Sequence, residues 1–161
     1  MKVRSIFPRR SMAVGSVLIA TDFSRLAAAA VTYTSRLLPS GARLHLLNVQ
    51  HPQALSPADY RVGPWSPAAR AEHRRHLADC QRRLDQLAAR LTRAHGFRVS
   101  AAVMVDWQVA PAICATARRK RAALIAVGSH GNTGLKSVFL GSVAQGVLNC
   151  ADRPVLVVRH R

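Results

Sequence analysis

A glycine pattern in the last third of the chain has the spacing of a phosphate-binding loop. The chain reads Gly128-Ser129-His130-Gly131, continues for nine residues, and then reads Gly141-Ser142-Val143. Glycine lets the backbone approach a ligand closely, and the first N–H groups of a helix, which lack intrahelical acceptors, attract anions. Because the apolar run 122–127 comes directly before, the order strand, loop, helix predicts a nucleotide-phosphate site. The alternative is that these glycines only mark turns.

Two other nucleotide loops do not occur in the sequence. No lysine follows a glycine at the spacing G-x4-G-K-[ST], and no G-x-G-x-x-G follows the first apolar run, Val14–Ala20. Ser142 stands where the next helix should begin, so its hydroxyl is predicted to cap that helix or to donate to a phosphate.

The supply of carboxylates bears on catalysis. The seven acidic residues are Asp22, Asp59, Glu72, Asp79, Asp85, Asp106 and Asp152. Only Asp22, which follows the first apolar run, is predicted beside the glycine loop. A two-metal site or an acid–base carboxylate pair cannot readily be assembled from one carboxylate. The sequence therefore predicts a nucleotide-binding protein without catalytic residues, in which ATP hydrolysis or autophosphorylation is at most slow.

Apolar runs alternate with helical patterns along the chain, which predicts an open five-stranded parallel sheet with helices on both faces. The expected strands are Val14–Ala20, Arg43–Val49, Val99–Val105, Leu124–Val127 and Pro154–Val158. The expected helices are Leu26–Leu38, capped by Ser24, then Pro67–Ala94, Val109–Lys120 and Ser142–Cys150. Ligands bind such sheets beyond the carboxyl ends of the strands, where the strand order reverses. The loops Thr21–Phe23 and Gly128–Gly131 are therefore the ones predicted to form the site, and Asp22 faces the glycine loop if the first and fourth strands are neighbours.

The chain resembles the universal stress protein family from about Val14 to Val158, and looks like its ATP-binding branch. The resemblance is carried by the G-x2-G-x9-G-S pattern, by Val17–Ser24, by Leu46–Val49 and by Arg153–Val158. It implies a Rossmann-like single domain over residues 14–161, preceded by a basic leader over 1–13, with strand order 3-2-1-4-5. It also implies a homodimer in which the last strand, Val155–Val158, pairs with its counterpart.

The resemblance also implies the roles of individual residues. Asp22 would contact the ribose or the Mg²⁺-phosphate group, the backbone of Val49 would hold the adenine edge, and the amides of Gly141, Ser142 and Val143 would bind phosphates. The implied nucleotide-binding set is Ala20, Thr21, Asp22, Val49, Val127, Gly128, His130, Gly131, Gly141, Ser142 and Val143. The implied cofactors are ATP and Mg²⁺, the latter at Asp22. For Asp22 the alternative is a turn residue that caps the helix near Ser24.

Two positions depart from the family pattern, and one of them is Ala123, which replaces a common acidic residue before the fourth strand. A glycine usually follows the third strand, whereas here Asp106-Trp107-Gln108 stands in its place. Because this position is not at the predicted phosphate site, nucleotide binding is still expected, and Trp107 is predicted to alter the loop or a partner surface.

The charge of the chain is strongly positive. There are 24 basic and 7 acidic residues, for a formal net charge of +17. Such a surface attracts polyanions, so weak, non-specific binding of nucleic acid is expected. The alternative function is therefore a basic nucleic-acid-associated module whose glycine loop is only structural. Its surface would be the arginines of the long helix, namely Arg70, Arg74, Arg75, Arg82, Arg83, Arg90 and Arg93.

Cysteine usage and hydropathy indicate a cytoplasmic protein. Cys80, Cys114 and Cys150 are widely spaced and odd in number, so they are predicted to be reduced, buried thiols. No apolar run approaches the roughly 20 residues that cross a bilayer, so no membrane association is expected. His73, His76 and Cys80 share one side of a helix, but a metal site there would need a further ligand, and a plain amphipathic helix is the simpler interpretation.

Overall fold

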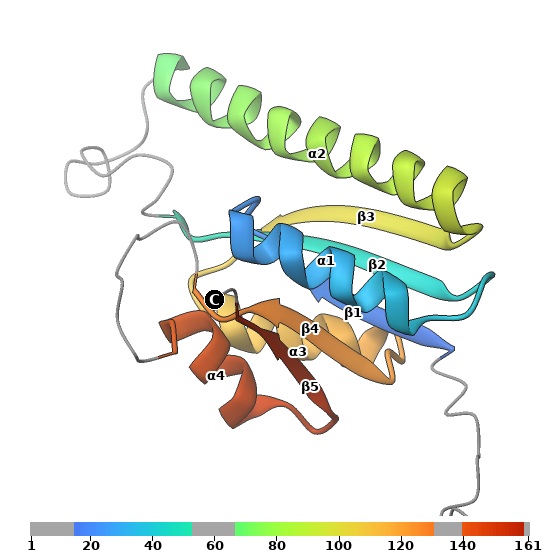
Figure 1. The fold of residues 1–161 in the computed structure, drawn as a ribbon. Helices are drawn as coiled ribbons and strands as arrows, with labels where there is room; N and C mark the ends of the chain where they lie inside the picture. The colour runs from blue at the N-terminus through green and yellow to red at the C-terminus, as the bar shows by residue number, and fades with distance from the viewer. Residues whose placement is uncertain (1–14, 53–66, 131–139, 160–161) are drawn as a thin grey trace, which may run out of the picture.

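The computed structural model describes residues 15–52, 67–130 and 140–159, which form one parallel sheet with four helices (Figure 1). The strands are β1 (Ser16–Ala20), β2 (Arg43–Gln50), β3 (Arg98–Val105), β4 (Leu124–Gly128) and β5 (Val155–Val158). The helices are α1 (Arg25–Leu37), α2 (Pro67–His95), α3 (Val109–Arg119) and α4 (Ser142–Cys150). The strand order is β3-β2-β1-β4-β5, so the predicted fold class and order 3-2-1-4-5 are confirmed.

Two hydrophobic clusters cover the two faces of the sheet. On one face Val17 and Ile19 of β1 pack with residues of α1 and α2, including Val31 and Leu84. On the other face the intervening Leu18 packs with residues of α3 and α4. Successive side chains of a strand point to opposite faces, so the apolar run of β1 is buried on both. The helix pairs α1–α2 and α3–α4 therefore lie on opposite sides of the sheet.

The observed boundaries differ little from the expected ones. Pro154 lies just before β5 rather than in it, and α2 ends one residue later than predicted, at His95. The predicted leader 1–13, residues 53–66 before α2, and Gly131 with the segment 132–139 lie outside the described residues. Among the residues that are described, no helix is long and apolar enough to cross a membrane.

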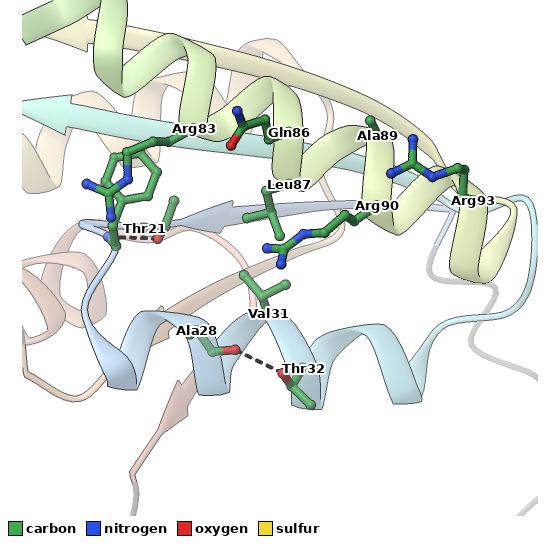
Figure 2. Close-up of a pocket in the computed structure, with 11 residues that line it drawn as sticks. Thr21, Ala28, Val31, Thr32, Arg83, Gln86, Leu87, Ala89, Arg90 and Arg93 are labelled. Carbon is green, nitrogen blue, oxygen red and sulfur yellow. Dashed lines mark hydrogen bonds between the residues drawn. The ribbon is translucent and has the colours of Figure 1, made fainter.

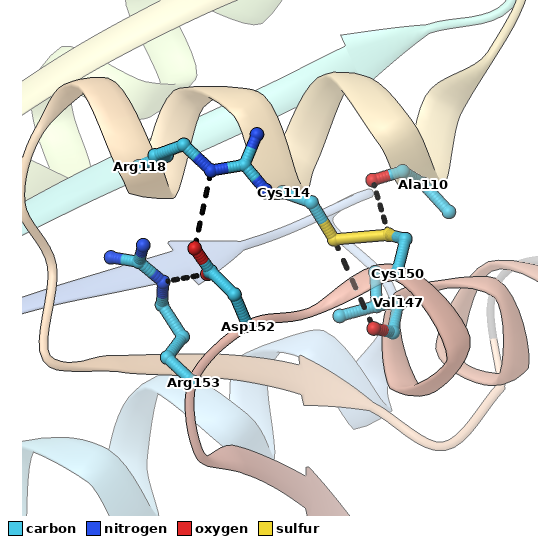
Figure 3. The surroundings of a disulfide bond; sticks show 7 residues. All are labelled: Ala110, Cys114, Arg118, Val147, Cys150, Asp152 and Arg153. Atoms are coloured by element: carbon cyan, nitrogen blue, oxygen red, sulfur yellow. Dashed lines mark hydrogen bonds and ion pairs between the residues drawn. A yellow bond between two sulfur atoms is a disulfide. The ribbon is translucent and has the colours of Figure 1, made fainter.

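The prediction that all three cysteines are reduced thiols is wrong for two of them. Cys114 of α3 and Cys150 at the end of α4 form a disulfide, with their Cα atoms 6.4 Å apart (Figure 3). Cys80 is free and buried. The pairing was not predictable because the two cysteines are 36 residues apart and meet only when α3 and α4 pack together. Cysteine usage therefore no longer supports the prediction of a reducing, cytoplasmic compartment.

A charged cluster fixes the turn between α4 and β5. Arg118 Nε of α3 lies 3.1 Å from Asp152 Oδ2, and Arg153 Nε lies 2.7 Å from Asp152 Oδ1 (Figure 3). The hydrogen bond from Arg153, followed in size of effect by that from Arg118, holds the pKa of Asp152 well below its usual range. Arg153 also donates from Nη1 to the carbonyl of Ala117 at 3.1 Å. The start of β5 is thereby tied to the end of α3.

Candidate functional site

The loop that follows β1 is held by its own side chains. The Thr21 hydroxyl accepts the Phe23 N–H at 3.0 Å, and Asp22 Oδ1 accepts the Ser24 N–H at 3.0 Å. The Ser24 hydroxyl in turn accepts the Ala27 N–H at 3.1 Å, which confirms Ser24 as the N-cap of α1. Phe23 has a φ of 63°, a conformation that non-glycine residues adopt rarely and mostly at turns and functional sites.

These contacts show that Asp22 does act as a turn residue, the alternative role weighed for it. The turn uses Asp22 Oδ1, and it places the carboxylate at the carboxyl end of β1, next to β4 in the sheet. A role in the turn is compatible with a role toward a ligand, because an ionised carboxylate has about four lone-pair sites.

Asn48 positions this loop, although sequence reasoning did not single it out. Its side chain is 1% exposed, and Nδ2 donates to the Thr21 carbonyl at 2.7 Å. Gln50 Nε2 donates to Asn48 Oδ1 at 2.6 Å, and the Thr21 N–H donates to the Leu47 carbonyl at 2.9 Å. The available signal was an amide side chain in an otherwise apolar strand, since buried polar groups require partners.

Replacement of Asn48 by leucine should lower the free energy of unfolding by about 1–3 kcal/mol, because it leaves the buried carbonyl of Thr21 without its donor. Urea denaturation measures the change. Gln50→Leu removes the partner of Asn48 Oδ1 and leaves the bond to Thr21 in place, so it measures the other half of this network. A free energy of unfolding of Asn48→Leu equal to that of the wild type would contradict the positioning role of Asn48.

The segment after β4 meets the start of α4. The Ser129 N–H donates to the Val158 carbonyl at 2.8 Å, and the Gly141 N–H donates to the Ser129 carbonyl at 2.8 Å. The N-cap of α4 is Gly141, and no side chain of the described residues caps this helix. Of the two roles predicted for the Ser142 hydroxyl, the cap is therefore wrong, and the phosphate contact stays a prediction. Ser142 is instead the first residue of the helix, and it is exposed.

The amides at the start of α4 divide into two groups. The Gly141 N–H already donates to the Ser129 carbonyl. The N–H groups of Ser142 and Val143 come before that of Gln145, which donates to the Gly141 carbonyl. By their position they have no acceptor within the helix. Two adjacent N–H groups at a helix N-terminus suit an anion such as a phosphate.

Gly128 is required by packing at the end of β4. A Cβ atom built on it would lie 2.9 Å from the backbone nitrogen of Ala27 and 2.9 Å from the carbonyl carbon of Leu26. The first turn of α1 therefore rests directly on Gly128. The resemblance implied that this glycine leaves room for a ligand; its contact here is with the backbone of α1.

His130 carries a buried polar atom that has no partner among the described residues. Its Nδ1 lies 3.2 Å from the Ser129 hydroxyl, and its Nε2 is buried without a hydrogen bond. Most buried polar atoms are paired, so an unpaired one at a predicted ligand site needs an explanation. A hydroxyl or phosphate oxygen of a ligand would satisfy it.

Val49 and Trp107 lie at the same carboxyl edge of the sheet. β1 ends at Ala20, which pairs with Leu47, so β2 extends past it through Val49. Along a strand of a parallel sheet, the backbone N–H and C=O groups of successive residues point in turn to one neighbouring strand and to the other. The backbone groups of Val49 therefore point to the same side as those of Leu47, beyond the end of β1. Trp107, 53% exposed, packs edge-on against His51 with ring centroids 5.3 Å apart.

The candidate metal ligands on α2 form a pair at most. His76 Nε2 lies 3.5 Å from Cys80 Sγ, and burial raises the pKa of the Cys80 thiol. Within the three described ranges, no group of three His, Cys, Asp or Glu side chains could hold a metal ion.

The strand order defines an α/β protein with a topological switch point, where β1 and β4 are neighbours and their crossovers lie on opposite faces. Open parallel sheets bind their ligands at such a point. The chain belongs to the universal stress protein family, whose sequence profile matches residues 14–159. A 38-residue segment is 47% identical to the universal stress protein MJ0577 of Methanocaldococcus jannaschii and spans 24% of this chain and 24% of that relative.

Solved structures share the fold over nearly the whole chain. The structure of MJ0577 superposes with a TM-score of 0.79 at 23% identity, covering 92% of this chain and 98% of that one. A universal stress protein from Archaeoglobus fulgidus in complex with dAMP superposes with a TM-score of 0.52 at 18% identity, covering 92% and 100%. At these identities the likeness shows the fold.

Proposed function

We propose that this chain binds ATP with Mg²⁺ at the carboxyl edge of β1 and β4, and acts as a nucleotide-dependent switch or sensor in a stress response. The observation that carries the proposal is the pair of amides of Ser142 and Val143, which lack acceptors within α4. The buried Nε2 of His130, which is unpaired within residues 15–52, 67–130 and 140–159, adds a second group that a ligand would satisfy. The dAMP complex of a family member supports an adenine nucleotide as the ligand class.

Each part of the nucleotide would contact residues of suitable chemistry. The amides of Ser142 and Val143 and the hydroxyl of Ser142 would hold phosphate oxygens, and the backbone of Val49 would meet the adenine edge. Asp22 would bind the ribose hydroxyls or the Mg²⁺ that accompanies the phosphates, since hard cations prefer carboxylate oxygens. Mg²⁺ supplies charge neutralisation of the phosphates when bound. With this single carboxylate predicted at the nucleotide, turnover should be slow.

Two substitutions at one position separate the amide from the hydroxyl. Ser142→Ala removes only the hydroxyl, whereas Ser142→Pro also removes the N–H. Proline is tolerated at the first position of a helix, and Gly141, with φ −63° and ψ 151°, already has the extended backbone that precedes proline. Calorimetric titration with Mg-ATP should show a further loss of about tenfold or more in affinity for Ser142→Pro, because a charge-assisted hydrogen bond contributes about 1.5–3 kcal/mol.

Thermal denaturation without nucleotide is the control, and it should give similar melting temperatures for both variants. Equal ATP affinity of wild type and Ser142→Pro would refute binding at α4. An absence of ATP binding by the wild type would refute the proposed function, and a steep salt dependence of nucleic-acid binding would then favour the basic-module alternative.

We also propose a homodimer through β5. This strand lies at the edge of the sheet, and Val155, Leu156 and Val157 are half-buried. An apolar edge strand presents unpaired backbone groups that a second strand can satisfy. Sedimentation velocity should give about twice the chain mass of 17.5 kDa. A single-chain mass at micromolar concentration would contradict the dimer.

A further inference from the structure

A groove of about 820 Å³ lies between α1 and α2, on the opposite side of the sheet from α4 (Figure 2). It starts at the loop after β1 and runs between the two helices. Its lining residues are Thr21, Phe23, Ala28, Val31, Thr32, Arg83, Gln86, Leu87, Ala89, Arg90 and Arg93. The volume is in the range of sites that hold small organic ligands.

The wall of the groove formed by α2 is positively charged. Arg83, Arg90 and Arg93 line it, and none of the lining residues is acidic. α1 carries no acidic residue, and none of the three acids of α2, Glu72, Asp79 and Asp85, lines the groove. Asp79 pairs with Arg82, and Asp85 accepts a hydrogen bond from Gln81. Within the described part of the chain, neither Arg90 nor Arg93 forms an ion pair. Along α2 a ligand would therefore meet guanidinium groups without competing carboxylates, while Asp22 stands in the loop between the lining residues Thr21 and Phe23.

The floor of the groove is apolar. The side chains of Val31 from α1 and Leu87 from α2 approach each other there, and Arg90 extends over them (Figure 2). At the end next to the β1 loop, the Arg83 guanidinium lies 4.0 Å from the centroid of the Phe23 ring. This cation–π contact holds Arg83 over the groove while its N–H groups remain available as donors.

We propose that this groove is a second binding site, for an amphiphilic anion that consists of an apolar chain with an acidic head group. The apolar chain would lie on Val31 and Leu87, and the head group would accept hydrogen bonds from Arg90 and Arg83. Guanidinium groups bind carboxylates and phosphates bidentately, so both head groups fit the same chemistry. The nucleotide site has its amide donors on α4, on the other side of the sheet, and shares with the groove only Thr21 of the loop after β1.

Titration of the full chain with decyl phosphate and with decanoate, both below micelle-forming concentrations, tests the proposal. Arg90→Gln should weaken binding of the preferred anion by roughly tenfold, as expected for one lost charge-assisted hydrogen bond. Comparison of the two probes decides between a phosphate and a carboxylate head group. Inorganic phosphate and decanol should each bind much more weakly, since inorganic phosphate lacks the apolar chain and decanol lacks the acidic head group.

Arg82→Gln is the matched control, because Arg82 is on the same helix and pairs with Asp79 rather than lining the groove. It changes the net charge equally, so it should leave probe binding close to that of the wild type. Equal losses in Arg82→Gln and Arg90→Gln would overturn the proposal and indicate attraction by net charge alone. Displacement of the probe by ATP would also overturn it, since the groove would then belong to the nucleotide site.

Discussion

Reduction of the Cys114–Cys150 disulfide is expected to lower the free energy of unfolding by about 3–4 kcal/mol, because a cross-link that closes a loop of this length restricts the unfolded chain. The two cysteines are 36 residues apart. The bond also joins the last residue of α4 to α3, and α4 has only nine residues. A short helix gains little stability by itself, so α4 depends on such tertiary contacts.

Urea denaturation of Cys80→Ala with and without dithiothreitol measures this contribution, because the only remaining thiols are then those of the disulfide. Cys80→Ala/Cys114→Ala/Cys150→Ala is the control, and dithiothreitol should not change its stability. Thiol titration of the unreduced wild type in denaturant should find one free thiol. Three free thiols, or no effect of dithiothreitol on Cys80→Ala, would contradict the disulfide.

Replacement of Gly128 by alanine is expected to lower the free energy of unfolding by about 1–3 kcal/mol, the usual range for overpacking. The added Cβ would lie 2.9 Å from backbone atoms of Leu26 and Ala27, and no rotamer change can relieve contacts with backbone. The first turn of α1 must therefore shift, together with the Asp22 turn and the Ser24 cap that lead into it. ATP affinity should fall with stability.

Gly146→Ala is the matched control. Its added Cβ would meet only the Ala110 methyl group, at 2.7 Å, so the second substitution Ala110→Gly should recover part of the lost stability. Hydrogen exchange should show faster exchange of the Ala27 and Ala28 amides in Gly128→Ala than in Gly146→Ala. Unchanged exchange at these two amides would show that α1 does not rest on Gly128.

The fold was predictable because its signals are local. Strands buried on both faces appear as continuous apolar runs, as in β1, and the long helix appears as a stripe of leucines spaced three and four residues apart. Alternating strands and helices then leave few topologies, and the family resemblance implied the order that the structure confirms. The two loops of the candidate site were predictable for the same reason, because they follow apolar runs directly.

The predictions that were wrong, and the features that were missed, depend on contacts between distant segments. The cap of α4 was one of the two roles predicted for Ser142 from its residue type, whereas the backbone bond between Gly141 and Ser129 accompanies Gly141 as the N-cap. The Cys114–Cys150 pair and the bond from Asn48 to Thr21 join residues 36 and 27 positions apart. No residue pattern encodes such distances.

The sequence by itself determined the parallel α/β fold, its strand order through the family pattern, and the two loops that carry the candidate nucleotide site. Only the tertiary structure decided which amides of α4 remain available, why Gly128 cannot carry a side chain, and where arginines of α2 face an apolar floor. The physical reason is that periodicity and residue type report burial and local backbone preference. The partner of a buried polar group, a thiol or a charged side chain is set by packing between elements.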